Sequence, residues 1–97
     1  QLAQMALEVE PARALMWYAA YAWDTGLADA PRTAALAKAH IADRFVSITR
    51  AAIAAHGGIG YTWEYGLAIW FRRAMFDRAY LGSPAVHRAR AADLAGW

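Results

Sequence analysis

The sequence predicts an all-α fold, a four-helix bundle in which three long helices with up-down connections are followed by a shorter C-terminal helix. Three observations predict it. Apolar residues recur at steps of three and four, the period of a helix face, and no stretch alternates with a period of two. Hydrophobic residues make up 60% of the chain, and much of this content is alanine, which favours helix. The breaks between segments are short, so neighbouring helices are expected to be antiparallel.

The first helix is predicted to run from Leu2 to Trp23. Its apolar face consists of Leu2, Met5, Val9, Ala12, Met16, Ala19 and Trp23. Pro11 should bend this helix or start a new helical segment, because proline lacks the backbone N–H. The helix should end at Asp24-Thr25-Gly26, where Gly26 suits a left-handed C-terminal cap.

The second helix is predicted from about Pro31 to Ala55, with Asp29 as a candidate N-cap and Pro31 in the first turn. Its apolar stripe consists of Ile41, Phe45, Ile48, Ala52 and Ala55. It should end at the glycine-rich segment 56–62, because three glycines in four positions break a helix.

The third helix, which Thr62 can cap, is expected to reach about Tyr80. Its buried side is predicted to consist of Leu67, Trp70, Phe71 and Ala74. Leu81-Gly82-Ser83-Pro84 is a second break, in which Ser83 can serve as the N-cap of the last helix and Pro84 as a residue of its first turn. The last helix should end near Gly96.

The charged residues exclude some functions. The net charge of +2 is too small an excess to argue for a nucleic-acid partner. Five arginines near the C-terminus are interleaved with aromatic residues and show no helix-turn-helix spacing; they are Arg72, Arg73, Arg78, Arg88 and Arg90. Asp77 lies one helical turn from Arg73 and can form a surface ion pair with it, whereas Asp43 and Arg50 are seven residues apart.

Metal and membrane functions find no support in the sequence. Cysteine is absent, and His40, His56 and His87 lack the spacing of metal ligands, so no metal site is expected. His56 can close the end of the second helix, where histidine is favourable. No apolar run reaches the roughly 18–20 residues of a membrane span, and no signal peptide is visible. We therefore expect a cytoplasmic protein.

The most specific pattern is the stretch 54–65, which reads A-A-H-G-G-I-G-Y-T-W-E-Y and is followed by Arg72-Arg73. It resembles the C-terminal domain of acyl-CoA dehydrogenases, whose helix-breaking loop reads Gly-Gly-x-Gly-Phe/Tyr before a Thr/Glu-Tyr helix start. Val9-Glu10-x-Ala12-Arg13, Asp24-x-Gly26 and Lys38-Ala39 also fall where this family has counterparts. The resemblance covers essentially the whole chain and implies that residues 1–97 are one domain of a larger protein.

The resemblance implies FAD-dependent α,β-dehydrogenation of an acyl-CoA thioester, an electron acceptor, and a homo- or hetero-oligomer formed through the helical bundle. FAD bound to one subunit would reach the glycine loop of its neighbour, where backbone N–H groups can approach a phosphate. The implied cofactor-binding residues are Gly57, Gly58, Gly60 and Ser83. The glutamine that the family usually carries four residues before Gly58 is Ala54 here.

The family's catalytic glutamate lies in a Tyr-Glu-Gly-Thr segment, to which Tyr80-Leu81-Gly82-Ser83 corresponds. Leu81 therefore occupies the usual position of the base, and leucine cannot accept a proton. Three explanations stay open: the base lies on an earlier helix upstream of Gln1, a partner subunit supplies it, or the protein is a non-catalytic relative. Glu64 is the only carboxylate near either loop and is expected to compensate the helix dipole rather than act as base. The alternative function is a non-catalytic helical protein-interaction module.

Overall fold

A computed structural model describes residues 2–57 and 66–97. It contains the helices α1 (Leu2–Asp24), α2 (Ala30–Ala55), α3 (Leu67–Ala79) and α4 (Pro84–Ala95). The predicted all-α fold with four helices is confirmed, and the described residues contain no strand. Within these same ranges, no helix combines the length and the hydropathy needed to cross a membrane.

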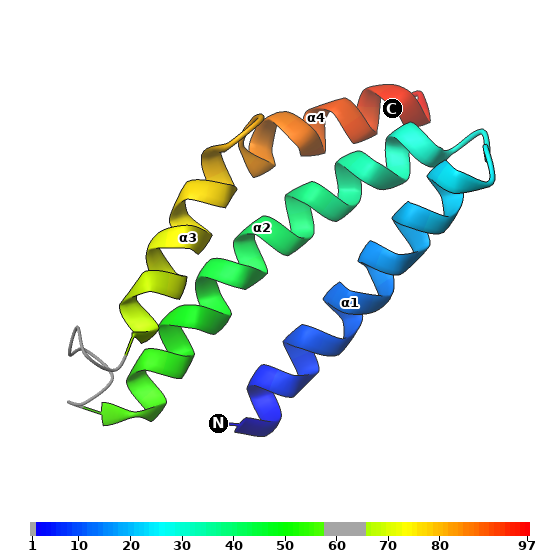
Figure 1. Cartoon of the computed structure of the whole chain (residues 1–97). Helices are drawn as coiled ribbons and strands as arrows, with labels where there is room; N and C mark the ends of the chain where they lie inside the picture. The colour runs from blue at the N-terminus through cyan, green and yellow to red at the C-terminus, as the bar shows by residue number, and fades with distance from the viewer. Residues whose placement is uncertain (1, 58–65) are drawn as a thin grey trace.

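Helix α2 is the centre of the arrangement and packs against each of the other three helices. Figure 1 shows α1 running along one side of α2 in the opposite direction. On the other side, α3 and α4 lie end to end, and α4 continues in the general direction of α3. The contacts of α3 and α4 with α2 therefore determine how these two short helices are oriented.

Helix α1 continues without interruption through Pro11, so the new helical segment expected there does not form. Proline removes one hydrogen bond to the carbonyl four residues earlier, which belongs to Leu7. Leu7 is 69% exposed, so water can reach this part of the helix and solvate a carbonyl that lacks its partner. The helix ends as predicted, because Gly26 adopts a φ of 70°. The Leu27 N–H then donates to the Ala22 carbonyl at 2.9 Å, which closes a Schellman motif.

Asp29 precedes α2 as expected, but its side chain makes no capping hydrogen bond. Its backbone carbonyl instead accepts hydrogen bonds from the Thr33 N–H at 2.9 Å and from Thr33 Oγ1 at 3.0 Å. The carboxylate lies 3.7 Å from Arg32 Nη2. Asp29 therefore occupies the predicted N-cap position, but its carboxylate is directed to a neighbouring cation instead of the helix N–H groups.

The core consists mainly of small side chains, which let the helices approach α2 closely. On α2 the buried positions that repeat at steps of three and four are Ala35, Ala39, Ala42, Val46, Thr49 and Ile53. The other helices contribute Ala12, Ala22, Ala74, Pro84 and Ala91. Most of the larger apolar residues lie outside this set.

The predicted buried faces are only partly correct. On α2, Ile41 and Phe45 are half-buried and Ala55 is exposed, because the closest packing involves the neighbouring alanine-rich face. Trp70 on α3 is 60% exposed and Trp23 on α1 is 62% exposed. Periodicity correctly identified apolar faces, but the neighbouring helix decides which part of each face is covered.

Candidate functional site

The described ends of the two segments belong to different helices: Gly57 lies at the end of α2, and the second segment joins α3 to α4. Gly57 follows the end of α2, whereas Ser83 follows the end of α3. Helix α3 has 13 residues, which corresponds to a length of about 20 Å. Gly57 and Ser83 thus lie in different connections of the chain, and each segment is considered separately.

At the first segment, the end of α2 is closed by His56. The His56 N–H donates to the Ala52 carbonyl at 3.3 Å, and its ring Nδ1 donates to the same carbonyl at 2.8 Å. This confirms that His56 can close the helix. Of the segment's predicted residues, Gly58, Gly60, Thr62 and Glu64 lie outside the described part of the chain.

Gly57 adopts a φ of 63°, a left-handed conformation that favours glycine. Among the described residues, no heavy atom lies within 4 Å of the position that a Cβ of residue 57 would occupy. The need for glycine is therefore conformational rather than steric.

At the second segment, Leu81 has a φ of 62° and is the only non-glycine residue with positive φ among the described residues. A left-handed conformation costs an ordinary L-residue about 1–2 kcal/mol. The Leu81 side chain is 77% exposed, so burial contributes little to offset this cost. The surrounding contacts must hold the turn in place.

His87 supplies one of these contacts. Its Nε2 donates to the Leu81 carbonyl at 2.9 Å. A Cβ at Gly82 would lie 2.8 Å from the same nitrogen and would displace the His87 ring, and the φ of 110° itself favours glycine at this position. The His87 Nδ1 is buried and has no hydrogen-bond partner within the described chain. The sequence did not predict this role of His87. The only signal for it is the position of His87 in the first turn of the last helix, close to the preceding turn.

Ser83 begins α4 as predicted. Its Oγ accepts a hydrogen bond from the Val86 N–H at 3.3 Å, and Pro84 follows as the first helical residue. The hydroxyl of Ser83 acts here as an acceptor, so its own proton can be directed toward a ligand. The structure thus assigns Ser83 a capping role, and a cofactor contact is compatible with this role.

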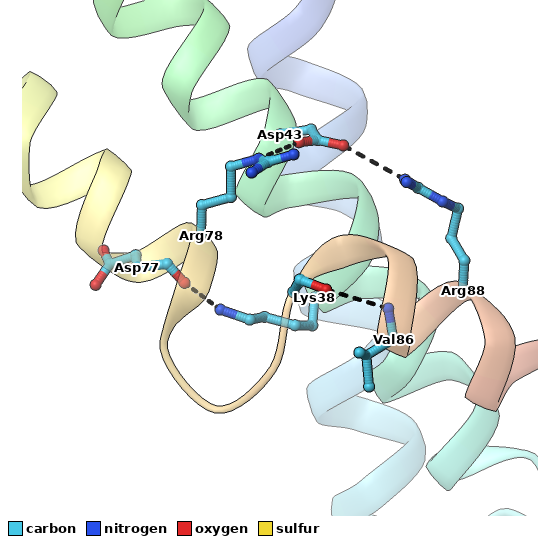
Figure 2. Close-up of polar contacts among 7 residues, drawn as sticks. Lys38, Asp43, Asp77, Arg78, Val86 and Arg88 are labelled. Carbon is cyan, nitrogen blue, oxygen red and sulfur yellow. Dashed lines mark hydrogen bonds and ion pairs between the residues drawn. The ribbon is translucent and has the colours of Figure 1, made fainter.

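A charged cluster on α2, α3 and α4 borders the second segment (Figure 2). Asp43 Oδ1 accepts a hydrogen bond from Arg78 Nε at 2.7 Å, and Asp43 Oδ2 lies 3.4 Å from Arg88 Nη1. The hydrogen bond from Arg78 is the main cause that lowers the pKa of Asp43, while burial opposes it. Lys38 Nζ donates to the backbone carbonyl of Asp77.

The remaining charged pairs agree in part with the sequence. Arg73 Nε donates to Asp77 Oδ1 at 2.9 Å, which confirms the predicted surface pair. Arg50, seven residues from Asp43, instead lies 5.7 Å from the ring centroid of Phe71. Arg50 therefore connects α2 to α3 through a cation–π contact.

A mostly apolar pocket lies between α1 and α2. Its volume is about 330 Å³, and it is lined by Val9, Ala12, Arg13, Met16, Ile41, Arg44, Phe45 and Ile48. The lining contains no carboxylate or imidazole, so this pocket offers no general base. In the part of the chain that the structure describes, no group of three or more His, Asp or Glu side chains could hold a metal ion.

Comparison with known proteins places these features in context. Residues 1–95 match the family model described as "Acyl-CoA dehydrogenase, C-terminal domain". The short-chain-specific acyl-CoA dehydrogenase of Clostridium acetobutylicum is 36% identical over 89 residues, which cover 90% of this chain and 23% of that protein. No solved structure gave a significant match.

Two further relatives show similar coverage. The acryloyl-CoA reductase (NADH) of Anaerotignum propionicum is 32% identical over 87 residues, covering 90% of this chain and 22% of that protein. The cyclohexane-1-carbonyl-CoA dehydrogenase of Syntrophus aciditrophicus is 33% identical over 87 residues, again 90% of this chain and 22% of that protein. The chain thus spans less than a quarter of the length of these relatives.

Proposed function

The chain belongs to the acyl-CoA dehydrogenase family and corresponds to the C-terminal domain of its members. We propose that this domain takes part in the FAD-dependent α,β-dehydrogenation of a CoA thioester. The observation that carries the proposal is the family match over residues 1–95. Each of the three relatives is named for a CoA thioester: an acyl-CoA, acryloyl-CoA or cyclohexane-1-carbonyl-CoA. The common thioester supports this substrate class, while the acyl groups differ.

The glycine segment after α2 would contact FAD held by a neighbouring subunit. FAD, when bound, supplies the acceptor for the hydride that leaves the substrate. Gly57 supports such a contact, because it adopts a left-handed backbone and none of the described residues crowds its Cα. Glycine lets backbone N–H groups approach a phosphate closely. We include Gly58 and Gly60 in this contact on the basis of the family resemblance.

The α3–α4 turn would border the acyl group rather than perform proton transfer. Leu81 presents an exposed apolar side chain, and it has no group that could accept a proton. We propose that the base comes from a partner subunit or from a helix that precedes this domain. A general base must reach the proton that it removes, so either source has to place a carboxylate beside this turn.

The same domain would also form the core of an oligomer. Large apolar side chains are exposed on several helices, among them Trp17 at 63% and Trp70 at 60%. So many large exposed apolar side chains on a short chain support contact with another protein surface. They equally support the second candidate function, a non-catalytic helical interaction module.

A nucleic-acid function gains no support from the arginines near the C-terminus. Arg78 and Arg88 are paired with Asp43, and Arg73 is paired with Asp77. Guanidinium groups that already contact carboxylates are less available to phosphates, which bind through net positive charge.

The test uses the full-length protein in its purified oligomeric form. We expect visible flavin absorbance that bleaches anaerobically when a CoA thioester from a panel of straight, branched and cyclic acyl groups is added. Flavin content without bleaching by any member would contradict the substrate class, and absence of flavin would favour the interaction module.

Gly57→Ala and Gly26→Ala form a matched pair for the cofactor contact. Both glycines have left-handed φ angles, 63° and 70°, and open space around the Cβ position, so both variants carry a similar conformational cost. We expect only Gly57→Ala to lower the FAD content. Equal FAD content in the two variants would remove Gly57 from the proposed site.

A further inference from the structure

The orientation of α4 relative to α3 depends on contacts that both helices make with α2. Helix α3 packs on α2 with its buried Ala74, and α4 does so with Pro84 and Ala91. These side chains are small or compact and carry no hydrogen-bonding group, so the contact that they make with α2 is not directional. A directional contact is needed to fix the angle.

Asp43 provides such a contact, because one carboxylate on α2 binds side chains from both short helices. Arg78 Nε donates to Oδ1 at 2.7 Å from the last turn of α3. Arg88 Nη1 donates to Oδ2 at 3.4 Å from α4. The side chain of Asp43 lies between the two arginines in Figure 2, and each oxygen serves one of them.

A second tie joins α2 to the same end of α3. Lys38 Nζ donates to the carbonyl of Asp77, directly before Arg78. Carbonyl groups in the last turn of a helix lack intrahelical partners, and a lysine there also compensates the helix dipole. Lys38 and Asp43 thus hold the last turn of α3 from two positions on α2.

The turn between α3 and α4 contains the strained residue Leu81. Leu81 adopts a φ of 62°, and Gly82 a φ of 110°. Strain of this kind persists only where the surrounding structure fixes the chain on both sides. Arg78 lies three residues before Leu81, and Arg88 lies six residues after Gly82 and next to His87, which binds the Leu81 carbonyl.

We infer that Asp43 is a positioning residue that fixes α3 against α4 and thereby holds the Leu81–Gly82 turn in its left-handed conformation. It acts through Arg78 and Arg88 and touches no reacting atom itself. The part of the inference that concerns turnover rests on the proposed function, in which the Leu81–Gly82 turn borders the acyl group. The conformational part stands independently of any substrate.

Amide hydrogen exchange in the full-length protein tests the conformational part. Asp43→Asn removes the charge with little change in shape, and Asp77→Asn is the matched control because the Asp77 carboxylate pairs with Arg73 on its own helix. We expect Asp43→Asn to speed exchange about threefold at the amides of Tyr80 and Gly82, as loss of an exposed ion pair allows more frequent local opening. Exchange in the middle of α1 should not change.

The controls separate positioning from general stability. Asp77→Asn should leave exchange in the turn unchanged, and Asp43→Glu, which keeps the charge, should restore most of the protection. A uniform increase over all helices in Asp43→Asn, or an unchanged turn, would overturn the inference.

Turnover provides an independent measurement. If the wild-type protein oxidises a CoA thioester, we expect kcat/KM of Asp43→Asn to fall about threefold at unchanged flavin content, because a turn that is held less firmly positions the acyl group less precisely. An unchanged kcat/KM would overturn the part of the inference that concerns turnover. If the wild type is inactive toward every thioester, the proposed function fails, and hydrogen exchange still decides the role of Asp43.

Discussion

Arg78 on α3 donates a hydrogen bond from Nε to Oδ1 of Asp43 on α2 at 2.7 Å, although 35 residues separate the two in the sequence. Arg88 approaches the other oxygen of the same carboxylate from α4. A single exposed ion pair contributes about 0.2–1 kcal/mol. Here one carboxylate connects helices α2, α3 and α4, so its importance lies in their relative orientation.

The stability of the fold should depend on the ionisation of Asp43 in acid. The hydrogen bond from Arg78 holds the pKa of Asp43 below its ordinary value in the folded state. The stabilisation is therefore fully present above the unfolded-state pKa and is lost as the pH falls below about 4, through the lower folded-state pKa.

Urea unfolding at neutral and acidic pH checks this dependence. Asp43→Asn should be less stable than wild type at neutral pH, and the difference should shrink in acid. A difference that stays constant from neutral pH to well below the folded-state pKa would contradict the assignment.

Ala74 should be sensitive to enlargement, because it is fully buried between α3 and α2. Ala74→Leu is expected to lower the free energy of unfolding by about 1–3 kcal/mol through overpacking. Ala79→Leu on the same helix is the control, since Ala79 is exposed and surface changes stay within about 0.5 kcal/mol. Equal effects in thermal unfolding would show that α3 does not pack on α2 through Ala74.

Variants of Ser83 can distinguish its capping role from a role in cofactor binding. Ser83→Ala should destabilise the protein by about 1 kcal/mol, because the Val86 N–H loses its acceptor. Ser83→Asp should retain stability, since aspartate also caps and favours the helix N-terminus. If the Ser83 hydroxyl also donates to FAD, Ser83→Asp will lower flavin content at unchanged stability, whereas retained flavin would limit Ser83 to capping.

Leu81→Gly should stabilise the fold, in contrast to most substitutions by glycine. The left-handed conformation of Leu81 is strained for leucine and accessible to glycine, and the side chain is mostly exposed. The relief should exceed the entropic cost of glycine by about 0.5–1 kcal/mol. Leu94→Gly within α4 should instead destabilise by about 1 kcal/mol. A loss of stability in Leu81→Gly would show that the leucine side chain contributes more than its exposure indicates.

The ends of several helices could be predicted because they depend on nearby residues. Gly26 ends α1 and Gly96 ends α4 in left-handed conformations, and Ser83 caps α4. Each of these motifs involves hydrogen bonds over only a few positions in the chain. Asp29 shows the limit of such reasoning, since its carboxylate lies beside Arg32 rather than on the helix N-terminus.

The candidate site was predictable only as a set of segments. The pattern around Gly57 indicated the family, and the family match confirms that assignment. The cofactor contacts of Gly57, Gly58, Gly60 and Ser83 stay predictions. Of these residues the structure describes Gly57 and Ser83, and the sequence could not show how α3, which lies between them in the chain, packs along α2.

The sequence by itself determined the helical class, most helix boundaries and the family, because apolar period, capping residues and glycine spacing act over a few neighbouring positions. The tertiary structure decided which face of each helix is covered, why Trp70 stays exposed, and which cations surround Asp43. The physical reason is that burial and ion pairing depend on the distance to a second helix. No local pattern records that distance, and it is settled only when α3 and α4 pack along α2.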